Sequence, residues 1–134
     1  MFVNIYKDEI QILLLHNFVY DEDFFMFYYK TEWCPMNLTL HEKSKCVYAH
    51  NLQDYRRKVH ILRYSEVNCE NWDFKSFVTQ MDQNCKLGAK CNKSHGWKES
   101  EFHPLIYKTK PCLSIGDCPR NLECPFFHSP IEKR

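Results

Sequence analysis

The chain has 134 residues, with 18 Lys and Arg against 17 Asp and Glu, eight Cys and seven His. This length allows one small domain or a short array of modules and excludes a large multidomain enzyme. A hydrophobic fraction of 44% with 16% aromatic residues argues against wholesale disorder. No apolar run reaches the ~18–20 residues that span a bilayer, so we expect no membrane partner. A net charge of +1 gives no global sign of nucleic acid, so any basic surface must be local.

The N-terminal segment carries one apolar stretch, residues 10–15. It follows Asp8 and Glu9 instead of a basic region, and no small-residue cleavage site comes after it, so it does not resemble a secretory signal. We interpret it as a strand or short helix within an apolar and acidic lead-in, residues 1–28. Without a signal the expected location is a reducing compartment, the nucleus or the cytoplasm, where clustered cysteines usually bind metal.

Three of the eight cysteines are followed by a histidine after a gap of three residues. Fewer than about one such pair is expected by chance in this composition, and a motif match has to pass that check. The pairs are Cys46 with His50, Cys91 with His95, and Cys124 with His128. Upstream of the last pair, Cys112 and Cys118 complete the pattern C-x5-C-x5-C-x3-H. This is a set of four ligands for tetrahedral Zn²⁺ in a closed structural site.

The other two clusters are completed by more distant residues. The second has Cys85, and the nearest unassigned cysteine is Cys69, fifteen residues before it when only intervening positions are counted. Loop closure costs only ~0.6 kcal/mol per doubling of length, which makes this long interval tolerable. The first has Cys34, and His41 lies where a second cysteine is missing. The predicted ligands of three zinc ions are Cys34, His41, Cys46, His50; Cys69, Cys85, Cys91, His95; and Cys112, Cys118, Cys124, His128.

Other interpretations of the cysteines remain open at this stage. A disulfide framework also uses an even number of cysteines, but it does not explain the repeated histidine interval. Buried cysteines without metal are a second alternative. Asp82 or a nearby histidine is an alternative to Cys69 as a ligand. His16, His60 and His103 are interpreted as surface or packing histidines.

The expected fold is a small, zinc-stabilised and mostly irregular one, with short helical turns and little regular sheet. Segments of about 25–30 residues bury too little apolar surface to fold alone, and a structural zinc contributes ~10–16 kcal/mol. Short helices or strands are expected over residues 54–63 and 74–81. The predicted units are a lead-in (1–28), finger 1 (29–53), a basic linker (54–68), finger 2 with a long first loop (69–97), a second linker (98–106) and finger 3 (107–134).

The sequence also resembles a known family. The pattern C-x5-C-x5-C-x3-H, preceded by residues 107–111 (YKTKP), resembles the CCCH zinc fingers of mRNA-regulating proteins, and residues 29–33 (YKTEW) look like a second copy of that lead-in. The order of the array, with a Cys/His/Cys/His finger first and a basic linker after it, is similar to the plant-type arginine-rich tandem CCCH proteins and the Unkempt family. The resemblance covers residues 21–130 and departs in the long first interval of finger 2 and in a thinner arginine cluster.

The resemblance implies a non-enzymatic protein that binds single-stranded RNA, A/U-rich or U-rich, and regulates mRNA stability or translation, with mRNA-regulatory proteins as further partners. It also implies a base-stacking aromatic two residues after the third ligand, which is Tyr48 in finger 1 and Phe126 in finger 3. Finger 2 has Lys93 there, and Leu87 at the other stacking position. The predicted RNA contacts are Tyr48, Phe126, Arg56, Arg57, Lys58, Arg63, Lys30 and Lys108.

Each of these assignments has an alternative. The alternative for Tyr48 and Phe126 is packing against the zinc thiolates. The basic run at residues 56–58 is also compatible with a solvated helix face, or with phosphate binding. The whole array would serve equally as a protein-interaction module or a transcription regulator without RNA readout. An enzyme is disfavoured because every cluster is filled by protein ligands, no small-molecule substrate is indicated, and the C-x2-C pairs of ubiquitin-ligase modules are absent from the sequence.

Overall fold

The computed structural model describes residues 21–35, 41–42, 46–72, 80–120 and 123–134. Its helices are short: α1 (Glu22–Phe27), α2 (Val59–Leu62), the 3-10 helices η4 (Met81–Gln83) and η5 (Gly88–Lys90), and α3 (Trp97–Glu101). In these ranges β-structure is limited to isolated bridges, and no helix is long and apolar enough to cross a membrane. The prediction of a small, mostly irregular, zinc-stabilised fold is confirmed. The apolar stretch at 10–15 and residues 74–79 lie outside the described ranges.

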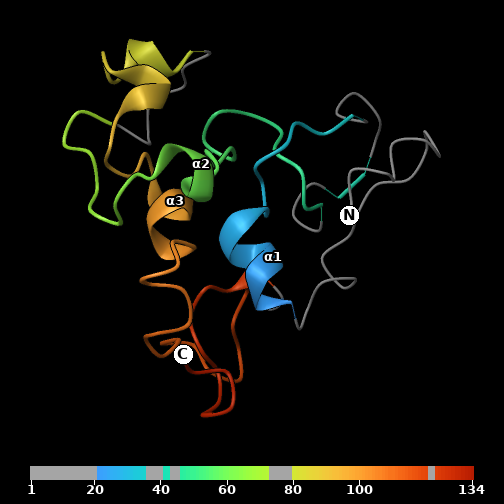
Figure 1. Cartoon of the computed structure of the whole chain (residues 1–134). Helices are drawn as coiled ribbons and strands as arrows, with labels where there is room; N and C mark the ends of the chain where they lie inside the picture. The colour runs from blue at the N-terminus through green and yellow to red at the C-terminus, as the bar shows by residue number, and fades with distance from the viewer. Residues whose placement is uncertain (1–20, 36–40, 43–45, 73–79, 121–122) are drawn as a thin grey trace.

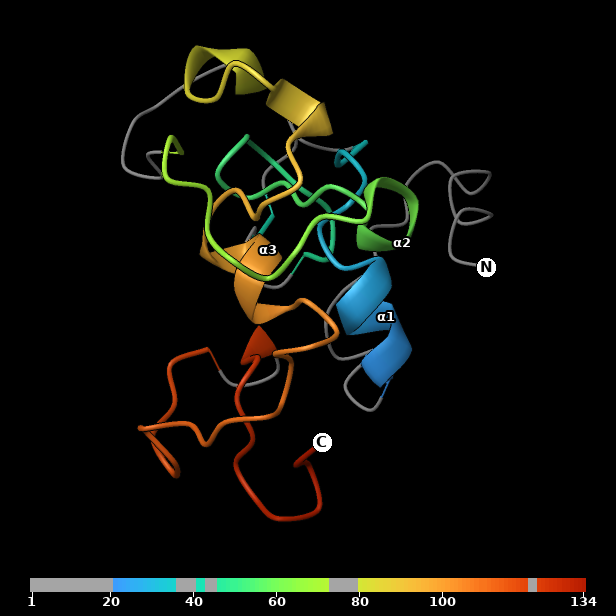
Figure 2. The same ribbon diagram turned by 60° about the vertical axis from the view of Figure 1, so that its left-hand side comes forward.

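Helices α1 and α3 lie at the centre of the molecule, with the 3-10 helices of finger 2 at one end and finger 3 at the other (Figures 1 and 2). Asp21, the residue before helix α1, is its N-cap, and its carboxylate accepts the Phe24 backbone N–H at 2.9 Å. The linker segment 54–63, expected as a short helix or strand, contains α2.

The lead-in helix forms the main hydrophobic core together with finger 1 and the linker before finger 3. Phe25 is 1% exposed and stacks on Phe102 and on Tyr107, with ring centroids 6.4 and 6.2 Å apart. Tyr29, which is fully buried, packs on Phe102 at 4.9 Å, and its hydroxyl donates to the Glu123 carboxylate of finger 3. Burying an aromatic side chain contributes about 1.5–3 kcal/mol, so this cluster fixes the lead-in onto finger 1 and the second linker.

The three fingers share one local architecture. In each, the residue before the first cysteine forms a parallel bridge with the residue before the ligand histidine: Trp33 with Ala49, Asn68 with Ser94, and Pro111 with Phe127. The N–H of the first cysteine then donates to the bridged residue across 2.8–2.9 Å. A tyrosine five residues before that cysteine is buried in every finger: Tyr29, Tyr64 and Tyr107.

Arg56 lies fully buried between α1 and the linker that follows α3. Its Nη1 donates to the carbonyls of Phe25 and Tyr29, both at 2.9 Å, and its Nη2 donates to Met26 at 2.7 Å and Phe102 at 3.3 Å. The last carbonyls of a short helix have no partner inside the helix. Arg56 satisfies several of these carbonyls at once, and it ties the end of α1 to the residue that ends α3.

Arg57 connects the same linker to finger 2. Its guanidinium pairs with the Glu99 carboxylate at 2.8 Å, and both side chains are 1% exposed. The same guanidinium donates to three finger 2 carbonyls, on Ala89, Cys91 and Lys93, at 2.6–3.1 Å. Since a buried charge is costly unless it is paired and hydrogen-bonded, these contacts must form together with the fold of finger 2.

We predict that Glu99→Ala lowers the free energy of unfolding of the zinc-loaded chain by about 3–5 kcal/mol, because it leaves the buried Arg57 charge uncompensated. Urea denaturation with zinc in excess measures the change. The matched control is Glu70→Ala, since Glu70 pairs with Lys93 but its side chain is 85% exposed. That substitution should cost less than about 1 kcal/mol. Equal effects of the two substitutions would contradict the structural role given to the buried pair.

Candidate metal centres and nucleic-acid surface

The twelve predicted ligands come together in three groups of four. In each group the ligand atoms lie within 4.8 Å of one another: Cys34, His41, Cys46 and His50; Cys69, Cys85, Cys91 and His95; Cys112, Cys118, Cys124 and His128. Asp82 is not part of the second group, whose fourth member is Cys69. No disulfide joins the eight cysteines, all of which lie in the described ranges. The three groups contain the same residues that the sequence spacing assigned to three sites, including Cys69 at the start of the long first loop of finger 2.

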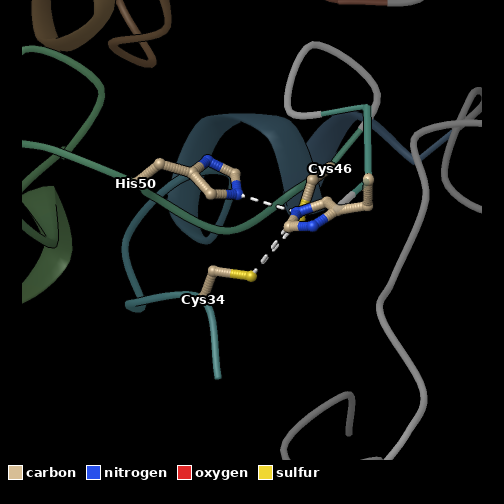
Figure 3. Close-up of side chains that lie close together, drawn as sticks. Cys34, Cys46 and His50 are labelled. Atoms are coloured by element: carbon tan, nitrogen blue, oxygen red, sulfur yellow. Dashed lines mark hydrogen bonds between the residues drawn. The ribbon is translucent and has the colours of Figure 1, made fainter. Parts of the chain in front are cut away.

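The donor atoms have the separations that a tetrahedral zinc requires. With Zn–S near 2.3 Å and Zn–N near 2.0–2.1 Å, the edges of the tetrahedron are about 3.8 Å between sulfurs and about 3.3 Å between nitrogens. In finger 1, the Cys34 and Cys46 sulfurs are 3.9 Å apart, and Nε2 of His41 is 3.2 Å from Nε2 of His50. Cys34, Cys46 and His50 converge on one point (Figure 3). The sulfurs of Cys69 and Cys85 are 3.8 Å apart.

The histidines of fingers 2 and 3 keep a buried ring nitrogen available for metal. Both ring nitrogens of His95 and Nε2 of His128 are buried without a hydrogen-bond partner. Burial, helped by the Arg57 charge, lowers the pKa of His95 to about 4, so the imidazole is neutral, the form that binds zinc. An orphaned imidazole nitrogen pointing at three sulfurs fits a Cys₃His zinc site. The chain therefore has three zinc sites, one Cys₂His₂ and two Cys₃His, and zinc supplies folding energy there.

An acidic residue four positions after the last ligand histidine of each finger supports that histidine. The carboxylates of Asp54, Glu99 and Glu132 accept the backbone N–H of His50, His95 and His128 at 3.0, 2.6 and 3.1 Å. In fingers 1 and 3 the carboxylate also reaches the ring. Asp54 lies 3.0 Å from Nδ1 of His50, and Glu132 lies 3.3 Å from Nδ1 of His128. This leaves Nε2 for the metal, and such carboxylate–histidine pairs orient zinc ligands.

A cation completes each unit by bonding the carboxylate and the carbonyl two residues before the histidine. Lys30 does so in finger 1, with Tyr48 O and Asp54 at 2.9 and 3.0 Å, and Lys108 does so in finger 3, with Phe126 O and Glu132 at 2.9 and 2.8 Å. Finger 2 has Ser65 at the equivalent position. There the cation is Arg57, which arrives from the linker and binds both Glu99 and Lys93 O. The spacing His-x3-Asp/Glu is visible in the sequence, and the sequence reasoning missed it.

Most of the side chains predicted to contact RNA have structural positions instead. Arg56 and Arg57 are 0% and 1% exposed, and Lys30 is 2% exposed, so these side chains offer no surface to a phosphate. Their assignment as RNA contacts is therefore corrected. In a fold with little regular structure many backbone carbonyls lack a backbone partner, and these three cationic side chains bind such carbonyls and buried carboxylates inside the protein. Neither alternative for the basic run, phosphate binding or a solvated helix face, describes the two arginines.

The remaining candidates differ in accessibility. Tyr48 is 1% exposed and belongs to the core cluster that contains Cys34 and Cys46, so it packs against the thiolates as the alternative stated. Lys108 is mostly buried, and Lys58 pairs with Glu32. Arg63 is exposed and ends α2 in the left-handed conformation. His60 is a surface histidine whose ring meets Phe27 and Tyr28 edge-on, and His103 is a buried packing residue 3.0 Å from the Tyr64 carbonyl.

Phe126 is the predicted aromatic that faces a cleft. A cleft of about 550 Å³ on finger 3, here called the finger 3 cleft, is lined by Lys110, Pro111, Cys112, Leu113, Ser114, Cys118, Pro119, Arg120, Cys124 and Phe126. Lys110 and Arg120 are its cations, and no carboxylate is among the described residues that line it. The aromatic face of Phe126 lies beside the zinc ligands with two cations and no carboxylate among the described lining residues, a surface on which a planar group can stack.

We predict that native mass spectrometry detects three zinc ions per chain, and two after either His41→Ala or Cys69→Ser, because each change removes one ligand from a filled site. Two zinc ions in the unmodified chain would contradict the assignment of the first or the second site.

The carboxylate that supports His128 gives a second prediction. Glu132→Ala should weaken zinc binding to finger 3 by about 10- to 100-fold, because the histidine ring loses the partner of its Nδ1. Competition with a chelator measures the affinity. Asp117→Ala is the matched control, since Asp117 is an exposed carboxylate of the same finger next to Cys118. A loss as large in the control would show that general electrostatics, not the contact with His128, sets the affinity.

The chain is similar in sequence to known proteins. Residues 23–57 match a CCCH zinc-finger family described as AtC3H23-like. The chain is 32% identical over 112 residues to "RING finger protein unkempt" of Drosophila melanogaster, covering 81% of this chain and 18% of that protein. It is 33% identical over 114 residues to "Zinc finger CCCH domain-containing protein 49" of Arabidopsis thaliana, covering 84% and 29%. It is 34% identical over 109 residues to the human "RING finger protein unkempt homolog", covering 75% and 13%.

The chain thus spans less than a third of the length of each of these relatives. The matched segment in finger 1, the relatives and the three four-ligand groups agree with the resemblance seen in the lead-ins and the ligand order. The chain is a CCCH zinc-finger protein, similar to the Unkempt proteins and to the plant CCCH proteins.

Proposed function

We propose that the chain binds single-stranded RNA and regulates the stability or translation of mRNA, with finger 3 as its main contact surface. The single observation that carries the proposal is the finger 3 cleft, which combines the half-buried ring of Phe126 with Lys110 and Arg120. Unstacked bases bind by stacking on aromatic or Arg planes, and their phosphates bind cations. We infer A/U-rich or U-rich targets from the family resemblance alone.

The three fingers have unequal parts in this proposal. Finger 1 has little surface for RNA at its predicted contact positions, because its aromatic Tyr48 is buried and its Lys30 is buried and paired with Asp54. Finger 2 offers Lys93, paired with Glu70, and the exposed Leu87, neither of which stacks a base. Both fingers therefore serve to hold finger 3 in place, and the domain limits predicted from sequence mark zinc units within one packed body.

A non-enzymatic role is part of the proposal. The names of the Unkempt relatives contain "RING finger", but the chain spans only 18% of the length of one of these proteins and 13% of another. Its sequence has no C-x2-C pair of the kind that ubiquitin-ligase modules use. A closed site with four protein ligands leaves no open coordination position for a substrate. Location in the nucleus or the cytoplasm, and further mRNA-regulatory protein partners, belong to the same proposal.

We expect Phe126→Ala to weaken binding of the chain to a U-rich oligonucleotide by about 5- to 150-fold, because a base–aromatic stack contributes ~1–3 kcal/mol. Fluorescence anisotropy with labelled octauridylate measures the affinity, and native mass spectrometry checks that three zinc ions remain. Lys110→Ala should weaken binding and reduce its salt dependence, because one phosphate contact is lost.

Phe127→Ala is the control for the aromatic change. Phe127 is adjacent in the chain and similarly half-buried, but it pairs with Lys133 and does not line the finger 3 cleft. Unchanged affinity in Phe126→Ala, or an equal loss in Phe127→Ala, would refute the stacking role. If the unmodified chain binds no single-stranded RNA, the RNA-binding proposal is wrong, and a protein-interaction module becomes the favoured function.

A further inference from the structure

Trp97 is a large aromatic residue that the zinc sites do not use. It is the first residue of α3, directly after Gly96, whose φ of 90° directs the chain away from the ligand His95. Its indole is 40% exposed, which is unusual for a residue of this size in the middle of a packed molecule. An exposed indole that borders a cleft offers a plane on which a base can stack.

Trp97 lies on the rim of two hollows at once. One is a small cleft of about 120 Å³ on finger 2, which Trp97 shares with Trp72. The other is a cleft of about 490 Å³, here called the central cleft, lined by residues of finger 1, α3 and finger 3. Arg120 lines both the central cleft and the finger 3 cleft. Trp97 and Arg120 are thus the residues that the three clefts have in common, Trp97 for the small and the central cleft and Arg120 for the central and the finger 3 cleft.

Arg120 connects the two aromatic residues along this surface. Its guanidinium carbon lies 4.7 Å from the ring centroid of Trp97 and 5.7 Å from that of Phe126. The Glu101 carboxylate holds Nη1 at 2.8 Å, which fixes the guanidinium between the two rings while a third of the side chain stays exposed. Trp97, Arg120 and Phe126 thus form a row of planar groups, the stacking row, that runs from α3 to finger 3.

The charges along the row favour one kind of occupant. The finger 3 cleft contributes Lys110 and Arg120 without a carboxylate among its described lining residues. The central cleft adds Lys98, which lies near the Trp97 ring and pairs with Asp54, and its lining also includes the carboxylate of Glu123, so the cations without a carboxylate beside them in the lining lie at the finger 3 end. Successive planar surfaces with cations beside them match the alternating bases and phosphates of a single strand.

We propose that Trp97 is a second base-stacking platform, so that one RNA strand continues from Phe126 past Arg120 onto α3. Trp97 supplies the aromatic surface that finger 2 lacks at Leu87 and Lys93. The inference rests on the proposed RNA binding and deepens it: the site accepts a strand longer than finger 3 alone can hold, and at least two of its bases stack on protein.

Strand length separates this inference from binding by finger 3 alone. We expect Trp97→Ala to weaken binding of octauridylate about 10-fold, while binding of a trinucleotide, which fits on finger 3, changes less than about 2-fold. Trp97→Phe should restore most of the affinity, because an aromatic plane remains. Trp33→Ala is the matched control, since Trp33 is 50% exposed but stacks on Tyr55 and is not among the described residues of the three clefts.

A second readout is independent of the folding of any variant. In nuclear magnetic resonance spectra of the zinc-loaded chain, the indole N–H signal of Trp97 should shift on addition of octauridylate, and the signal of Trp33 should not. Equal loss of affinity for both RNA lengths in Trp97→Ala, an effect of the same size in Trp33→Ala, or an unshifted Trp97 signal would overturn the inference while leaving RNA binding in place. Failure of the unmodified chain to bind either RNA would overturn both proposals, and capture of a peptide by the stacking row alone would replace RNA as its occupant.

Discussion

The burial of two adjacent arginines, Arg56 and Arg57, is the constraint on which the rest of the structure depends. Their side chains point into different parts of the molecule: one holds the carbonyls of α1 and Phe102, and the other holds Glu99 and the carbonyls of finger 2. Burial lowers the pKa of Arg56. Burial also acts to lower the pKa of Arg57, but the hydrogen bond and the charge of Glu99, with smaller contributions from Tyr64 and Cys91, together outweigh it and raise that pKa, so both arginines keep their charge. Because a buried charge without partners is costly, the linker, α1, α3 and finger 2 have to assemble together.

Zinc and the two buried arginines therefore stabilise the fold in different ways. Each zinc closes a segment that is too short to build its own core, and the arginines and the aromatic cluster around Phe25 join the closed segments into one body. The unit of cation, carboxylate and ligand histidine, seen in all three fingers, links these two levels. In finger 2 the cation comes from outside the finger, since Arg57 replaces a lysine. Metal binding in finger 2 is consequently tied to the position of the linker.

How much could be predicted from the sequence depended on the range of the interactions. The ligand groups were predictable because C-x5-C-x5-C-x3-H is a local pattern whose spacing follows from metal geometry, and His41 and Cys69 followed by elimination. The burial of Arg56 and Arg57 could not be predicted, because the partners of their side chains lie more than 25 residues away in the chain and arginines in proteins are mostly exposed. Tyr48 and Phe126 occupy the same position relative to their ligands. Tyr48 lies in the core cluster with α1 and Phe102, whereas Phe126 is outside that cluster and lies beside a cleft.

The most direct test of this account follows the arginine side chains themselves during RNA binding. In a nuclear magnetic resonance titration of the zinc-loaded chain with octauridylate, the Nε–H signal of Arg57, which donates to Glu99 at 3.0 Å, should exchange slowly with solvent and should not move. The Nε–H signal of Arg120, whose side chain is 34% exposed, should shift. A shifted Arg57 signal with an unchanged Arg120 signal would contradict the account, because the buried linker arginines would then contact RNA in place of the finger 3 surface.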